Sequence, residues 1–127
     1  MPGMAGSLAT VLICEDEPAL RELMRISVGD GFDFAEADDA ASCLELARAT
    51  RPDVILLDVM LPGRDGIDVL RELRRDRDLA HTRVLVVTAQ PATRDDAMRA
   101  GADLVIEKPF DPDDIRTAVK EVISTKR

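Results

Sequence analysis

Five short runs with strand-like patterning, separated by segments with a helical spacing of apolar residues, constrain the fold of this chain most strongly. The runs cover residues 10–14, 32–37, 54–57, 84–87 and 104–106. Between and after them, apolar side chains recur three and four positions apart, as on the buried face of a helix. Strands that alternate with helices in this way form βαβ units around a parallel sheet. The sequence therefore predicts an α/β domain with five strand–helix units.

The first, third and fourth runs are apolar over almost their whole length, so we expect them to be the central strands, covered by helices on both faces. Pro18 and Pro112 suit first helical positions, and Asp111 can accept hydrogen bonds from the free amides of the last helix. Gly101 suits the end of a short helix. The mixed-charge run at residues 74–78 is interpreted as a solvated helix end.

Length and charge limit the classes of function. A chain of 127 residues has the size of one domain, which we place at residues 8–124 between a flexible segment at 1–7 and a polar tail or linker start at 125–127. A formal net charge of −8 repels phosphate backbones and anionic lipids, so direct nucleic-acid or membrane binding is not expected. The sequence contains no predicted membrane span or signal peptide, so we expect a soluble cytoplasmic domain.

The two cysteines, Cys14 and Cys43, lie in apolar-patterned segments. They lack the paired spacing of zinc ligands or of a disulfide framework. We interpret them as two buried, unreactive thiols.

Residues that can carry chemistry follow the predicted strands. Glu15 and Asp16 come after the first strand, Asp58 after the third, Thr88 at the end of the fourth and Lys108 after the fifth. Ligand sites of open parallel sheets lie beyond the carboxyl ends of the strands, so we expect these side chains to meet there. Crowded carboxylates favour a nearby cation, and oxygen ligands suit Mg²⁺. The sequence therefore predicts a magnesium site.

Asp58 is the predicted nucleophile of this site, because a carboxylate can form an acyl phosphate beside a bound metal. The Thr88 hydroxyl can donate a hydrogen bond to one phosphoryl oxygen, and the Lys108 ammonium can neutralise another. The pattern predicts a phosphoryl acceptor.

Four motifs together resemble the receiver domains of two-component response regulators. They are residues 12–18 (LICEDEP), residues 53–66 (DVILLDVMLPGRDG), the pair Thr88 and Ala89, and residues 108–110 (KPF). The resemblance covers about residues 8–124. It implies a flavodoxin-like, CheY-like (βα)5 fold, whose parallel sheet has the order 2-1-3-4-5.

The resemblance also implies individual roles. Asp58 is expected to be the phosphoacceptor, and Asp16, Asp58 and the backbone carbonyl of Met60 are expected to bind Mg²⁺, with Glu15 acting through water. The first acidic position of the motif is often Asp in this family. Here it is Glu15, which is one methylene longer.

Further roles are implied beyond the strand ends. Thr88 and Lys108 are expected to sense the phosphoryl group, and the bond between Lys108 and Pro109 is expected to be cis. Met60 and Gln90 are expected to tune dephosphorylation.

The chain departs from the family pattern at Val105. The family commonly has an aromatic residue three positions before the lysine, and its rotation follows the threonine. Valine has no ring to move between buried and exposed positions. We therefore expect a muted or rearranged switch on the face of the fourth helix, fifth strand and fifth helix.

By resemblance, the expected phosphodonor is a histidine kinase or histidine phosphotransfer protein. The expected target is a downstream protein effector or an output domain. The receiver itself is expected to be a monomer or a phosphorylation-dependent dimer. We expect no enzymatic activity beyond self-phosphorylation and self-dephosphorylation. One alternative is a receiver cut from a longer regulator with a DNA-binding or enzymatic output domain. An aspartyl-phosphate phosphatase is disfavoured because it typically has a second Asp where this chain has Met60. A flavin carrier is disfavoured because the acids in the loop after the first strand would repel the phosphate of a flavin.

Overall fold

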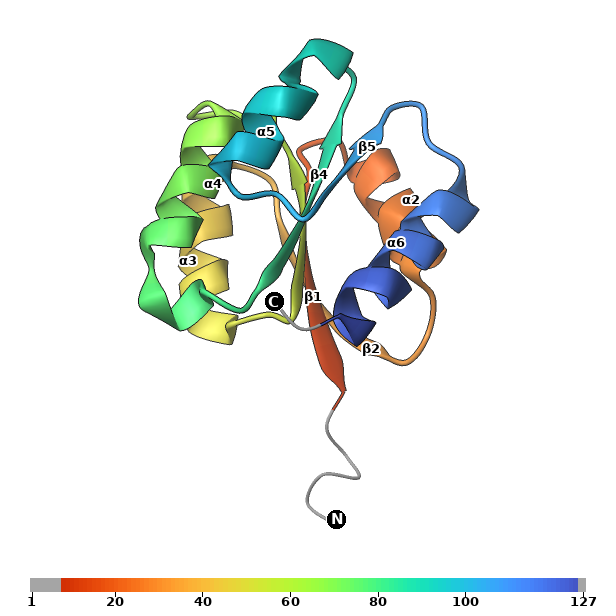
Figure 1. The fold of residues 1–127 in the computed structure, drawn as a ribbon. Coiled ribbons are helices and arrows are strands. Elements are labelled where there is room, and N and C mark those ends of the chain that lie inside the picture. The colour runs from red at the N-terminus through yellow and green to blue at the C-terminus, as the bar shows by residue number, and fades with distance from the viewer. Residues whose placement is uncertain (1–7, 126–127) are drawn as a thin grey trace.

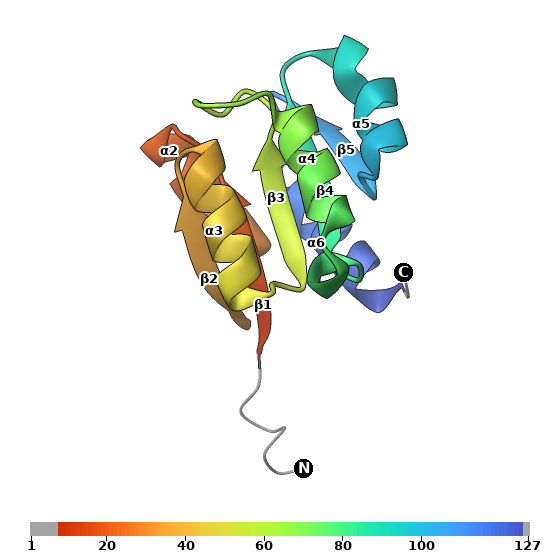
Figure 2. The same ribbon diagram turned by 90° about the vertical axis from the view of Figure 1, so that its left-hand side faces the viewer.

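The computed structural model describes residues 8–125, which form a parallel sheet between two layers of helices (Figures 1 and 2). The strands are β1 (Ala9–Cys14), β2 (Phe32–Ala37), β3 (Val54–Asp58), β4 (Arg83–Thr88) and β5 (Leu104–Glu107). Their order is β2-β1-β3-β4-β5, which confirms the implied flavodoxin-like topology and places the three apolar strands inside the sheet. The predicted flexible segment at 1–7 and the last two tail residues, 126–127, lie outside the described part of the chain.

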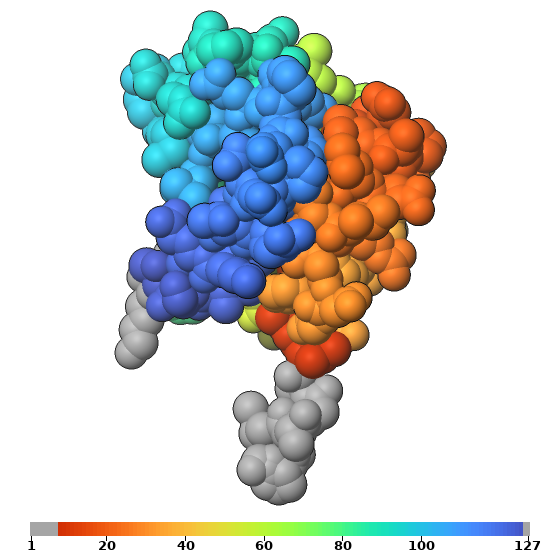
Figure 3. Space-filling view, turned by 90° about the vertical axis from the view of Figure 1, so that its right-hand side faces the viewer, coloured from red at the N-terminus to blue at the C-terminus, as the bar shows by residue number. Residues whose placement is uncertain are grey.

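Helices cover both faces of the sheet. They are α2 (Pro18–Val28), α3 (Ala40–Thr50), α4 (Gly66–Arg75), α5 (Arg94–Ala100) and α6 (Pro112–Ser124), with two 3₁₀ turns, η1 (Arg77–Leu79) and η2 (Pro91–Thr93). Helices α3, α4 and α5 lie on one face, and α2 and α6 lie side by side on the other (Figures 1 and 3). Between residues 8 and 125, no helix has both the length and the apolarity needed to cross a membrane.

The predicted helix ends are present. Pro18 and Pro112 occupy first-turn positions of α2 and α6, where a missing N–H costs no helical hydrogen bond. The side chain of Asp111 accepts a hydrogen bond from the Asp113 N–H at 2.8 Å. Helix α5 ends at Gly101, whose φ of 113° is in the left-handed region. These local signals mark the starts of α2 and α6 and the end of α5.

The core is aliphatic and divided by the sheet. Because side chains alternate along a strand, Leu12 of β1 packs towards α3 and α4, while Val11 and Ile13 pack towards α2 and α6. The same alternation continues through β3 and β4, whose residues are buried with the single exception of half-buried Arg83. Burial on both faces explains why these strands are apolar, and it makes the polar residues at their ends conspicuous.

The two cysteines meet inside the layer between the sheet and α3. Both side chains are fully buried, as predicted. However, the Sγ atoms of Cys14 and Cys43 are only 2.7 Å apart, a contact that their 29-residue separation did not indicate. Burial, with the hydrogen bond to Cys43, raises the pKa of Cys14 well above its usual value.

Arg74 is the exception to the interpretation of residues 74–78 as a solvated helix end, since Arg75, Arg77 and Asp78 are exposed. Its side chain is only 13% exposed and pairs with Asp103 at 2.9 Å. The guanidinium also donates to the carbonyl oxygens of Gly101 at 2.9 Å and Thr82 at 2.6 Å. Helical periodicity does not show that the loop after α5 folds over the end of α4. Arg74 therefore fastens α4 to the loops that flank β4 and β5.

Candidate functional site

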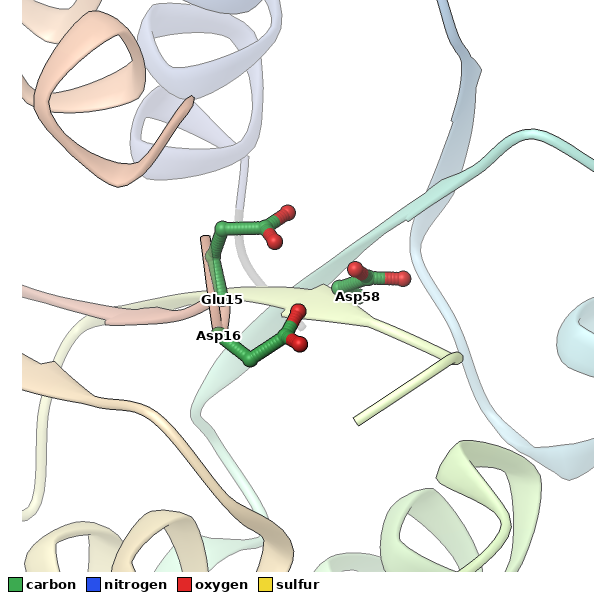
Figure 4. A group of neighbouring side chains, drawn as sticks. All are labelled: Glu15, Asp16 and Asp58. Atoms are coloured by element: carbon green, nitrogen blue, oxygen red, sulfur yellow. The ribbon is translucent and has the colours of Figure 1, made fainter. Parts of the chain in front are cut away.

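Three carboxylates gather where β1 and β3 end. In the register of these strands Cys14 is paired with Leu57, so Glu15 and Asp58 follow directly on adjacent strands. Oxygen atoms from Glu15, Asp16 and Asp58 lie within 4.8 Å of one another. The side chains of Glu15 and Asp16 extend from the end of β1 towards Asp58 (Figure 4). The structure thus brings together the acids that the sequence placed at this edge.

Glu15 is held on several sides. Its N–H donates to the Ala37 carbonyl at 3.0 Å, which extends the β1–β2 pairing beyond the last strand residue. Its carbonyl accepts from the Arg21 guanidinium at 2.8 Å. One carboxylate oxygen, Oε2, accepts from the Glu17 N–H at 3.1 Å. With only 1% of its surface exposed, Glu15 is a fixed part of the site.

Asp58 is equally confined, at 2% exposure. Its Oδ1 accepts from the Met60 N–H at 2.9 Å, and its Oδ2 accepts from the Lys108 ammonium at 3.0 Å. The same ammonium donates to Glu15 Oε1, also at 3.0 Å. Lys108 therefore bridges two buried carboxylates from β1 and β3.

The turn after Asp58 depends on Gly66. The Gly66 N–H donates to the Val59 carbonyl at 3.0 Å. A Cβ atom at position 66 would lie 2.3 Å from the Val59 Cα, closer than any real contact. Glycine is thus required for the start of α4 to pack against the residue that follows Asp58.

The electrostatics of the site favour a cation. Burial raises the pKa of Glu15, although hydrogen bonds from the Glu17 N–H and the Lys108 ammonium act in the opposite direction. Burial alone would lower the pKa of Lys108, but its hydrogen bonds to Glu15 and Asp58 raise it overall. Lys108 therefore remains protonated at neutral pH. Three carboxyl side chains share this site with a single ammonium, so acidic groups outnumber basic ones, and a divalent cation can offset that imbalance.

The donor set fits magnesium. All the candidate side-chain ligands are carboxylate oxygens, the type that Mg²⁺ prefers, and Asp16 is exposed, so a bound ion can keep water ligands. Met60 lies two residues after Asp58, donates its N–H to the Asp58 carboxylate, and is 58% exposed.

Thr88 ends β4 next to β3 and is fully buried. Its hydroxyl oxygen accepts from the Gln90 N–H at 3.0 Å. The Thr93 hydroxyl lies 3.3 Å from it and also donates to the Gln90 carbonyl at 2.7 Å. Thr88 is thus engaged with the loop that leads to α5. The contact of Thr93 with Thr88 could not be predicted from the sequence, because a threonine in a polar loop has no distinctive pattern.

The fifth strand leads to Lys108. The bond between Lys108 and Pro109 is cis, as the resemblance implied. Val105 is buried, at 8% exposure, among the apolar residues on the α5 side of the sheet. Its carbonyl accepts from the Arg94 guanidinium at 3.3 Å.

The family model of the response regulator receiver domain matches residues 11–120. The chain belongs to this family. Among curated relatives of the receiver domain, the DNA-binding response regulator MtrA of Mycolicibacterium smegmatis is 39% identical over 113 residues, which cover 87% of this chain and 48% of MtrA. The chain spans about half the length of the curated relatives it matches.

Solved structures agree with this assignment of the receiver domain. The signal receiver domain of NarL from Mycobacterium tuberculosis is 32% identical with a TM-score of 0.85, covering 94% of this chain and 99% of that one. The chemotaxis response regulator CheY4 of Vibrio cholerae is 26% identical with a TM-score of 0.85, covering 91% and 99%. The fold and the receiver-domain function expected from the motifs are confirmed.

Proposed function

We propose that Asp58 of this receiver domain accepts a phosphoryl group from the phosphohistidine of a histidine kinase or a histidine phosphotransfer protein. The observation that carries this proposal is the placement of Asp58 as a buried carboxylate between two further carboxylates and one ammonium. In the proposed metal site, Asp16, Asp58 and the Met60 carbonyl hold Mg²⁺, and Glu15 acts through water.

The reaction is a simple transfer. A carboxylate oxygen of Asp58 bonds to phosphorus while the bond between phosphorus and the donor's imidazole nitrogen breaks, leaving a neutral histidine after protonation. Bound Mg²⁺ supplies positive charge that screens the carboxylates from the incoming anion. The Lys108 ammonium, which lies 3.0 Å from the Asp58 carboxylate, then pairs with one oxygen of the transferred phosphoryl group. The Thr88 hydroxyl donates a hydrogen bond to a second phosphoryl oxygen.

The consequence of transfer is a change on the face formed by α5, β5 and α6. Thr88 must leave its partners in the loop before α5 to reach the phosphoryl group, so the modified state favours a different loop conformation. Val105 is buried and has no ring that could rotate outwards when the loop changes conformation, which supports a muted or rearranged switch. We propose that this face contacts a protein effector or output domain, as a monomer or as a phosphorylation-dependent dimer.

Two finer roles complete the proposal. Met60 and Gln90 are both exposed, and in this proposal their side chains tune the loss of the phosphoryl group by hydrolysis. Because MtrA is a DNA-binding response regulator about twice as long as the matched segment, a DNA-binding output domain joined to this receiver is one form that the effector can take.

Metal removal tests the dependence on Mg²⁺. We expect intact-mass measurement to show one added phosphoryl group after incubation with acetyl phosphate and Mg²⁺. We expect no adduct in excess EDTA, because the excess negative charge then repels the donor, and recovery when surplus Mg²⁺ is added back. Equal phosphorylation with and without EDTA would contradict the proposed metal site.

Substitution of Thr93 tests how Thr88 is held. Thr93→Val keeps the shape but removes the hydroxyl that contacts Thr88 and donates to the Gln90 carbonyl, so the unmodified state loses the contacts that hold Thr88 to the loop before α5. We expect beryllofluoride, a phosphoryl mimic, to bind about fivefold more tightly in calorimetric titrations with Mg²⁺. Thr93→Ser retains the hydroxyl and should match the parent protein. Unchanged affinity in Thr93→Val would rule out this restraint.

A further inference from the structure

Cys14 and Cys43 are positioned almost at bonding distance. Cys14 is the last residue of β1, and Cys43 lies in the first turns of α3. Their Sγ atoms are 2.7 Å apart, and both side chains have 0% exposure. A disulfide bond has a sulfur–sulfur separation of about 2.05 Å, so closure needs a movement of about 0.7 Å. The chain has two cysteines, and both belong to this contact.

We propose that Cys14 and Cys43 form an oxidisable dithiol that closes to a reversible intramolecular disulfide. The oxidant is a hydroperoxide or a low-molecular-weight disulfide. This modification site is separate from phosphoryl transfer and does not depend on the role of Asp58.

Access to the pair comes through local opening of α3. While α3 is packed, both thiols are sealed from water and from any oxidant. The helix buries only four residues, of which Leu44 alone is large, the others being Ala40, Cys43 and Ala47. A helix that buries so little apolar surface opens at a lower free energy than unfolding of the whole domain requires. It also packs beside β2, the partly exposed edge strand. Cys43 is therefore the thiol that solvent reaches first.

The chemistry then balances in two steps. The Cys43 thiolate attacks a peroxide oxygen, giving a sulfenic acid and releasing water from hydrogen peroxide. When α3 closes, the Cys14 sulfur displaces the sulfenic hydroxyl as a second water, and the S–S bond forms. The dithiol loses two electrons and two protons in total, and the peroxide takes up both. Closure in a dry layer protects the sulfenic acid from a second oxidant molecule.

The bond would tie α3 to the end of the central strand that precedes Glu15. It closes a long loop between β1 and α3 and so restricts the unfolded chain. We expect the oxidised protein to have a melting temperature higher by about 10 °C. Amide exchange in α3 should slow by at least tenfold, because the opening that exposes Cys43 is blocked.

The test uses the complete chain and hydrogen peroxide as the probe. After oxidation at a temperature where α3 amides exchange, the protein is denatured, treated with N-ethylmaleimide and weighed intact. We expect no maleimide on the oxidised protein, two after dithiothreitol, and a non-reduced proteolytic fragment joining the peptides of Cys14 and Cys43. The same procedure with oxidised glutathione in place of hydrogen peroxide should give the same disulfide by thiol–disulfide exchange.

Two variants make the result decisive. Cys43→Ala and Cys14→Ala each keep one thiol, and neither should gain stability on oxidation. Two alkylatable thiols in the peroxide-treated parent protein would overturn the proposal. So would a disulfide-linked dimer, or sulfinic acid at Cys43 without a crosslink.

Discussion

Asp58→Asn should abolish phosphorylation by acetyl phosphate, lowering uptake at least a thousandfold. The amide of asparagine is not a nucleophile for phosphorus, and none of the neighbouring groups can replace it without moving. Glu15 is fixed by hydrogen bonds to the Glu17 N–H and the Lys108 ammonium. The measurement is the fraction of protein carrying a phosphoryl group by intact mass under saturating donor and Mg²⁺.

A matched control separates this effect from a general loss of negative charge. Asp33 lies near the start of the edge strand β2, paired with Thr10 at the end of β1 opposite Glu15, and it is exposed, so Asp33→Asn removes the same charge at a distance from the site. We expect it to be phosphorylated like the parent chain. An adduct that survives in Asp58→Asn at parental levels would refute the assignment of Asp58, provided the circular dichroism spectrum shows a folded domain.

Gly66→Ala should destabilise the fold by about 3 kcal/mol or more, lowering the melting temperature by about 10 °C. The added methyl would stand 2.3 Å from the Val59 Cα and 2.7 Å from the Val59 carbonyl oxygen. Both are backbone atoms, so no rotamer change can relieve the clash, and either the turn after β3 or the start of α4 must move. Because Asp58 directly precedes this turn, we also expect slower phosphorylation in whatever fraction remains folded. Thermal unfolding followed by circular dichroism measures the stability change.

Gly63→Ala is the control within the same loop. Gly63 has a φ of 101°, so alanine is strained there, but its nearest contact for a new Cβ is Ala40 at an ordinary 3.8 Å. We expect a cost of about 1 kcal/mol. If Gly66→Ala proves no more harmful than Gly63→Ala, the close approach of α4 to Val59 is not a constraint on the fold.

The fold could be predicted from the sequence because its signals are local or periodic. Apolar runs identify the strands buried on both faces, and the family motifs imply the order of the sheet, both of which the structure confirms. Proline, aspartate and glycine at helix ends act over one turn, so Pro112, Asp111 and Gly101 are readable directly. The gathering of Glu15, Asp16 and Asp58 follows from the rule that parallel strands end at one edge.

Contacts between side chains from distant segments could not be predicted in the same way. The mixed-charge run gives no sign that Arg74 pairs with Asp103 across a loop. Lys108 was expected to sense a phosphoryl group, but its two simultaneous bonds to carboxylates depend on the exact course of the β5 loop. The hydroxyl contact of Thr93 and the thiol contact at Cys14 likewise require the packed structure, because neither has a fixed sequence spacing.

Chemical trapping at position 58 tests the central proposal most directly. The domain is phosphorylated with acetyl phosphate and Mg²⁺, reduced with sodium borohydride and digested for peptide mass spectrometry. An acyl phosphate on Asp58 is reduced to the corresponding alcohol, so we expect homoserine at position 58 and unchanged side chains at Glu15 and Asp16. Reduction at either of those acids, or a phosphoryl group that resists borohydride on a hydroxyl or nitrogen atom, would contradict the role of Asp58 as the phosphoacceptor.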